Sequence, residues 1–128
     1  VSKLPYMANV QKSLSSMEKV RSLNYEIYVI AHQSVEKKAS MDKIVTDNIA
    51  KEHQLSRIAL EVLTRPMTRE EVLAKYMKTL HINQREGLSM VIIAHSAWTR
   101  YIDLMAQGRI VYREGLLFKK DELDTAQT

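Results

Sequence analysis

Apolar positions recur with the period of an α-helix over much of the chain. Between Ser40, a suitable capping residue, and Arg65 they lie mainly three or four residues apart, which predicts one long amphipathic helix or two helices joined near Asn48. Pro66 favours an end to the segment, because proline disfavours helical geometry in the residue before it. The clearest part of this apolar face consists of Leu55, Ile58, Ala59, Val62 and Leu63.

A further helix is indicated after Thr68 by the residues at its N-terminal end. Thr68 and Glu71 have the spacing of a capping box, in which each residue binds a backbone N–H at the start of the helix. Met67 and Val72 stand at the positions of a hydrophobic staple across the same start. We therefore predict a helix after Thr68 whose inward residues are Val72, Leu73, Tyr76, Met77 and Leu80.

A third helix is predicted from Leu88 to Gln107. Asn83 and Glu86 form a weaker capping pair ahead of it. Gly108 follows it at the position where a left-handed residue ends a helix.

A short β-hairpin follows the third helix. Glu114 and Gly115 separate two short apolar runs, and this spacing is typical of a tight turn between antiparallel strands. We expect residues 121–128, which are polar and acidic, to form a disordered tail.

The N-terminal part of the chain predicts a helical segment over residues 15–52, preceded by a flexible leader over residues 1–14. Ser15 and Glu18 have capping-box spacing, and an apolar stripe follows from Val20 to Ile30. The residues Tyr25–Ile30 also favour a strand, but neither glycine nor proline bounds them, so we prefer the helix. A polar break over residues 36–40 separates this helix from the next. The N-terminal helix either mediates dimerisation or packs on its own domain.

Composition agrees with a mainly α protein of one domain plus appendages. The chain has 128 residues with only three glycines and two prolines, fewer than long loops and turns require. It has no cysteine, which excludes disulfides and thiolate chemistry and fits a reducing compartment. No apolar run is long enough to span a membrane. We expect a soluble, cytoplasmic protein without a membrane partner.

The positive charge is concentrated in the C-terminal half. The formal net charge is +4, and residues 75–120 contribute eight Lys and Arg against three acids, which makes +5. A local basic excess of this kind is typical of a surface that binds DNA, although many small basic proteins bind no nucleic acid.

No enzymatic or metal-binding pattern stands out. The four histidines, His32, His53, His81 and His95, do not pair in a metal-binding signature, and we expect no metal and no cofactor. The adjacent Glu70 and Glu71 are explained by capping and by the helix dipole. Without a Gly-rich phosphate loop or a nucleophile elbow, the sequence predicts a protein that is not an enzyme.

Two stretches together resemble the winged helix-turn-helix superfamily of bacterial, phage and plasmid transcription regulators. They are IALEVLTRPMTREEVLAKY, residues 58–76, and YIDLMAQGRIVYREGLLF, residues 101–118. The resemblance extends over roughly residues 53–120 and is to a fold pattern. It implies a winged-helix-like domain with an extra N-terminal helix, acting as a small dimeric regulator that binds double-stranded DNA.

The resemblance also implies which residues contact DNA. In that superfamily the third helix enters the major groove and the hairpin wing contacts phosphates or the minor groove. The positions that match the groove-facing residues are His95, Ser96, Thr99 and Arg100. Those that match the wing are Arg109, Arg113, Lys119 and Lys120.

The third helix departs from this pattern. Between Gly87 and Gln107 only Arg100 and Asp103 are formally charged, and apolar residues lie on both sides of the helix. A helix that is apolar nearly all round is usually buried. It is therefore either a central strut or packed between its own domain and a second subunit. The alternative function is a helical protein interaction module, an adaptor or inhibitor of a larger protein, that binds no DNA.

Overall fold

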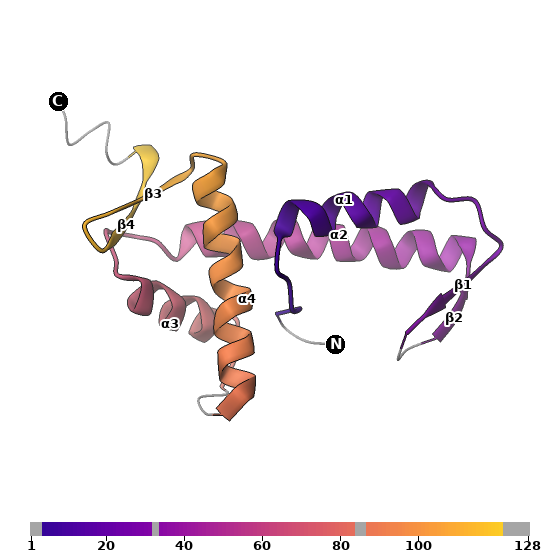
Figure 1. Ribbon diagram of the computed structural model, residues 1–128, viewed down its shortest axis with the longest axis horizontal. Helices are drawn as coiled ribbons and strands as arrows, with labels where there is room; N and C mark the ends of the chain where they lie inside the picture. The colour runs from indigo at the N-terminus through magenta and orange to yellow at the C-terminus, as the bar shows by residue number, and fades with distance from the viewer. Residues whose placement is uncertain (1–3, 32–33, 84–86, 122–128) are drawn as a thin grey trace. The chain divides into compact units, whose positions relative to one another are not determined.

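The computed structural model describes residues 4–31, 34–83 and 87–121, and its backbone is mainly helical with an antiparallel hairpin near the C-terminus (Figure 1). This confirms the predicted fold class. The elements are α1 Val10–Ser22, β1 Ile27–Ile30, β2 Ser34–Lys37, α2 Lys38–Glu61, α3 Arg69–Thr79, α4 Gly87–Ala106, β3 Ile110–Arg113 and β4 Leu116–Lys119.

The chain divides into two compact units. The N-terminal unit consists of residues 11–54, and the C-terminal unit joins residues 1–10 to residues 55–128. We predicted a boundary between residues 52 and 53. The predicted capping residue Glu86, and the predicted tail beyond Asp121, lie outside the described residues.

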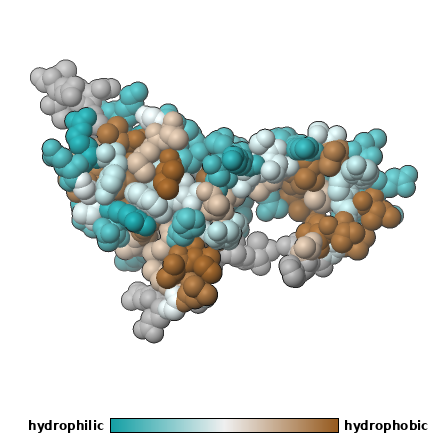
Figure 2. Space-filling model, in the orientation of Figure 1, coloured by the Kyte–Doolittle hydropathy of each residue, from teal (hydrophilic) through white to brown (hydrophobic). Residues whose placement is uncertain are grey.

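A hairpin in the N-terminal unit replaces part of the predicted helix. We predicted a helix through Tyr25–Ile30, but α1 ends at Ser22 and β1 pairs antiparallel with β2, with Val29 opposite Val35. The helix prediction was wrong because the aromatic and β-branched side chains of β1 pair across the sheet, which outweighs the absence of a flanking glycine or proline. Figure 2 shows apolar residues gathered over this hairpin.

The start of α2 also differs from the prediction. The predicted polar break over residues 36–40, with Ser40 as cap, is wrong, because β2 leads directly into α2 at Lys38. From there α2 is a single helix that passes Asn48 without interruption.

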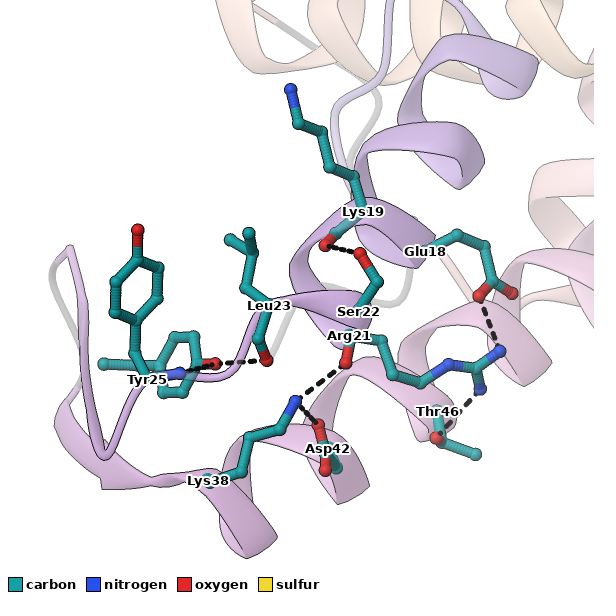
Figure 3. Close-up of polar contacts among 10 residues, drawn as sticks. Glu18, Lys19, Arg21, Ser22, Leu23, Tyr25, Lys38, Asp42 and Thr46 are labelled. Atoms are coloured by element: carbon teal, nitrogen blue, oxygen red, sulfur yellow. Dashed lines mark hydrogen bonds and ion pairs between the residues drawn. The ribbon is translucent and has the colours of Figure 1, made fainter.

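Polar contacts join the end of α1 to the first turns of α2 (Figure 3). The ammonium of Lys38 donates to the backbone carbonyl of Arg21 at 2.7 Å and pairs with Asp42 at 2.8 Å. The hydrogen bond to Asp42 raises the pKa of Lys38. The guanidinium of Arg21 reaches Glu18 at 2.6 Å and the hydroxyl of Thr46 at 3.3 Å. A cation thus satisfies a carbonyl at the C-terminal end of α1, where the helix dipole favours positive charge.

The segment expected to be a leader carries buried side chains. We predicted a flexible leader over residues 1–14 and a helix from Ser15, whereas α1 begins at Val10. Leu4 is 3% exposed and belongs to the core of the C-terminal unit. Removing these apolar side chains from water lowers the free energy, so the segment packs on the core instead of forming a solvated leader.

Two buried tyrosines organise the core of the C-terminal unit. The hydroxyl of Tyr76 on α3 donates to the carbonyl of Leu55 at 3.0 Å, and that of Tyr101 on α4 donates to the carbonyl of Ala59 at 2.7 Å. Their rings meet edge to face with centroids 5.7 Å apart. Burial raises the pKa of Tyr101 above its ordinary range. The other core residues come from the segment before α1, from α2 to α4, from the hairpin β3–β4 and from the loop before α3: Leu4, Leu55, Ala59, Val62, Leu63, Met67, Val72, Leu73, Ala97, Leu104, Ile110 and Leu117.

The capping box at the start of α3 is confirmed. The hydroxyl of Thr68 accepts a hydrogen bond from the backbone N–H of Glu71 at 3.2 Å. The Glu71 carboxylate also binds Arg65 at 2.7 Å, and this hydrogen bond lowers the pKa of Glu71. Met67 and Val72, the predicted staple residues, are both buried in the core.

The preceding helix, α2, ends at Glu61, ahead of the predicted stop at Pro66.

The predicted end of α4 is also confirmed. Gly108 has φ +71°, and its N–H binds the carbonyl of Met105 at 3.0 Å. The N–H of Arg109 binds the carbonyl of Leu104 at 3.0 Å. These two bonds form a Schellman motif, which turns the chain from α4 into β3.

The buried hydroxyl of Tyr101 gives a first prediction. Tyr101→Phe keeps the ring but removes the donor to the Ala59 carbonyl, so we expect the free energy of unfolding to fall by about 1–2 kcal/mol in urea denaturation at pH 7. Tyr112→Phe is the control, since Tyr112 is 49% exposed and should change stability by less than about 0.5 kcal/mol. Equal stability of the two variants would contradict this account of the core.

The same residue links stability to pH. The pKa of Tyr101 is higher in the folded than in the unfolded chain, so its contribution is full below the ordinary tyrosine pKa of 10.0 and is lost as the pH rises through the folded value. Tyr101→Phe should therefore show a shallower loss of stability above pH 10 than the wild-type protein.

Candidate nucleic-acid interface

The C-terminal hairpin is fixed to the core by backbone hydrogen bonds. Glu114 and Gly115 both have positive φ, as the two-residue turn between β3 and β4 requires. Leu117 of β4 exchanges two backbone hydrogen bonds with Met67, just before α3, at 2.7 and 3.2 Å. These two bonds attach the hairpin to the helical core at Met67.

The structure brings three of the four predicted wing cations together. Arg109, Lys119 and Lys120 line a hollow of about 240 Å³ at the base of the hairpin, with Leu60, Gly108 and Asp121 completing its wall. Arg113 lies at the turn end of β3, opposite Leu116. The pairing register places the Arg113 side chain on the other face of the hairpin from Lys119, so the four cations do not form one row.

These cations are accessible. Arg109, Arg113 and Lys120 are exposed and Lys119 is half-buried. Within the described residues, none of the four lies within 4.0 Å of a carboxylate oxygen in an ion pair. Such a surface can accept the negative charge of an external ligand.

Three of the four predicted groove-facing residues are buried. Ser96, Thr99 and Arg100 are 1%, 4% and 0% exposed. The guanidinium of Arg100 donates to the carbonyl of Ser96 at 2.7 Å and to that of Pro5 at 3.3 Å. In this arrangement α4 turns these three predicted groove-facing side chains toward its own unit instead of presenting them to a DNA groove.

His95, the fourth of these residues, is exposed beside the N-terminal segment. The Tyr6 ring stacks on it with centroids 6.2 Å apart and an interplanar angle of 29°. Together with the bond from Arg100 to Pro5, this contact places residues 4–6 along α4.

The exposed stripe of α4 carries no formal charge. Leu88 and Val91 are 75% and 65% exposed, and Ile92 and Ile102 extend the stripe. Figure 2 shows an apolar patch over the end of α4 at which the helix begins. A surface without charged groups lacks the Arg and Lys contacts that most often read guanine, so α4 is poorly suited to that form of base recognition.

A cluster around Trp98 includes two residues, Arg69 and Tyr112, that the sequence did not connect with it. The Trp98 ring stacks on Tyr101, and the guanidinium of Arg69 lies 4.7 Å from its centroid. Tyr112 of β3 meets the same ring edge to face at 6.2 Å. The cluster links the start of α3, the middle of α4 and the hairpin. No local spacing in the sequence links Arg69 to Trp98, so this contact follows only from the packing of α3 against α4.

Other chemistry is not evident in the described parts of the chain. Residues 4–31, 34–83 and 87–121 contain no cluster of three His, Asp or Glu side chains arranged to hold a metal ion. Among the helices in these ranges, none is long and apolar enough to cross a membrane.

Comparison with known proteins gave no match: no family model, no curated protein and no solved structure is similar to the chain.

The burial of Arg100 predicts that it supports the fold. Arg100→Ala removes two hydrogen bonds from a charged donor and leaves a cavity, so we expect the free energy of unfolding to fall by about 2–4 kcal/mol. Arg113→Ala, which removes an exposed arginine, should change it by less than about 0.5 kcal/mol. Urea denaturation of both variants measures the difference. Wild-type stability of Arg100→Ala would show that this side chain is not held in the interior.

Proposed function

We propose that the C-terminal unit binds double-stranded DNA through the hairpin β3–β4, as a winged helix-turn-helix domain does. The observation that carries the proposal is a hairpin pinned to the core at Met67 and Leu117 that presents four accessible cations. Cations held on a fixed frame can neutralise phosphates and release counterions, which supplies most of the affinity of nonspecific binding.

The order of elements supports the same proposal. The last turns of α2, the short strand contact at Met67, α3, α4 and the hairpin follow one another as the helices and wing do in the superfamily that the sequence resembles. The Schellman motif at Gly108 joins α4 to the hairpin through only a few residues. The proposed role is that of a dimeric transcription regulator in the cytoplasm, without catalytic activity.

The proposal assigns affinity to the hairpin and not to α4. The predicted groove-facing side chains Ser96, Thr99 and Arg100 are buried, so contacts to phosphates would dominate. Such binding varies little between DNA sequences and falls steeply with salt.

A protein interaction module is the second candidate, and the uncharged stripe of α4 favours it. Leu88 and Val91 are large apolar side chains exposed on one helix face. Exposed apolar patches of this kind often mark contacts with other proteins. The test compares binding of a protein partner to two variants. A partner that binds the wild-type protein should no longer bind Val91→Asp but should still bind Arg113→Ala. The reverse pattern would exclude α4 as the contact.

The DNA proposal predicts a specific response to salt. Binding to random-sequence duplex DNA, measured by fluorescence anisotropy across a salt series, should weaken in Arg109→Ala, Arg113→Ala and the double variant Lys119→Ala/Lys120→Ala. The slope of log affinity against log salt should become shallower by about one for each cation that contacts a phosphate.

Lys43→Ala is the matched control. Lys43 is an exposed lysine in the N-terminal unit, paired with Asp47, so its loss changes the net charge by the same amount as each single hairpin variant, away from the hairpin. It should bind DNA like the wild-type protein. Binding that is unchanged in all hairpin variants would contradict the wing assignment, and no binding of the wild-type protein at low salt would contradict DNA binding altogether.

A further inference from the structure

The hairpin β1–β2 has one covered face and one bare face. Tyr28, on the covered face, is 9% exposed, and its hydroxyl donates to the carbonyl of Leu23 at 2.9 Å. Ile30, on the same face, lines an apolar hollow with Met41 and Ile44 of α2. The register alternates the side chains, so the neighbouring residues point to the opposite side.

The bare face consists mainly of β-branched apolar residues. Ile27, Val29 and Val35 are 63%, 79% and 67% exposed, and Val29 lies directly opposite Val35. Lys37 is the charged residue of this face and lies at its far end, opposite Ile27. Tyr25, just before β1, is 61% exposed.

This arrangement is unfavourable in water for two reasons. A two-stranded sheet depends on packing for its stability, and among the described residues no third strand pairs with β1 or β2, so this hairpin is packed on its covered face alone. Exposed isoleucine and valine side chains also gain free energy when they are removed from water. A partner that covers this face relieves both conditions.

The shape and charge of the face suit a second copy of this chain. Two sheets can pack face to face, and a twofold axis brings identical apolar rows together. If the hairpins run in opposite directions, Lys37 of each copy lies beside the turn end of the other, so the two lysines stay apart. The centre of the contact then contains only Ile27, Val29 and Val35 from each copy.

The area of the bare face indicates the size class of the contact. The three side chains together with Tyr25 present on the order of 400 Å² per copy, a large patch for a monomer but about half of what a standard interface buries on each partner. A contact of this size belongs to the class of weak, reversible complexes.

We propose that the bare face of hairpin β1–β2 is a homodimer interface, in which Ile27, Val29 and Val35 pack against the same residues of a second copy. The inference deepens the dimeric part of the proposed function. It is tested without DNA, so its failure and a failure of DNA binding are separate results.

The experiment is sedimentation equilibrium from low micromolar to several hundred micromolar protein. The wild-type protein should dimerise within this range, and Val29→Lys should weaken dimerisation at least about tenfold, because each dimer loses two buried valines and gains two facing charges. Val91→Lys is the matched control, since Val91 is a similarly exposed valine on α4. It should dimerise like the wild-type protein. Circular dichroism checks that both variants keep the wild-type helix content.

Chemical cross-linking is a second measurement, which can detect a dimer even when the two copies associate weakly. The natural chain has no cysteine, so Val29→Cys introduces a single reactive thiol. A short bismaleimide should link two copies of Val29→Cys but not of Val91→Cys at the same concentration. A wild-type protein that stays monomeric throughout the range, a dimer unaffected by Val29→Lys, or a dimer weakened equally by Val91→Lys would each overturn the proposal.

Discussion

The C-terminal unit depends on two phenol hydroxyls that bind the last turns of α2. A helix ends with carbonyls that lack intrahelical partners, and burying such a group without a donor is costly. At the end of α2 the N–H of Leu63 binds the carbonyl of Leu60, and the carbonyl of Ala59 accepts from Tyr101 instead. The hydroxyl of Tyr76 donates to the carbonyl of Leu55, one turn earlier in α2. These bonds fix α3 and α4 on α2 and thereby determine where the hairpin β3–β4 begins.

The elements that could be predicted from the sequence are those defined by local interactions. The Thr68 cap, the left-handed Gly108 and the turn at Gly115 each need only a few neighbouring residues, and all three are present in the structure. The hairpin β1–β2 could not be predicted in the same way. Tyr25–Ile30 fits both helical and strand periodicity, and the deciding contact is with Val35, across a turn that carries no glycine or proline signal.

Which side of α4 faces the core could not be predicted, for a different reason. Both of its sides are apolar, so periodicity does not show which side faces the core. The deciding contacts come from distant segments: Pro5 accepts from Arg100, and Tyr6 stacks on His95. Pro5 thus helps to hold Arg100 inside the unit, whereas the Tyr6–His95 pair lies at the surface. The wing cations could be placed on a hairpin from the sequence, whereas their division between two faces follows from the register that places Arg113 opposite Leu116.

The charge distribution limits how the proposed DNA binding can work. The exposed stripe of α4, with Leu88 and Val91, supplies apolar contacts but no cation for a guanine edge, while the cations are on the hairpin. Phosphate contacts fix position and supply affinity without reading sequence. Sequence preference in such a protein has two physical sources, the shape of the DNA and the spacing of two linked subunits. The second source requires a dimer, and the bare face at Val29 is a suitable surface for one. In the proposed DNA-binding dimer, the N-terminal unit would contribute to sequence preference through the spacing of the two subunits.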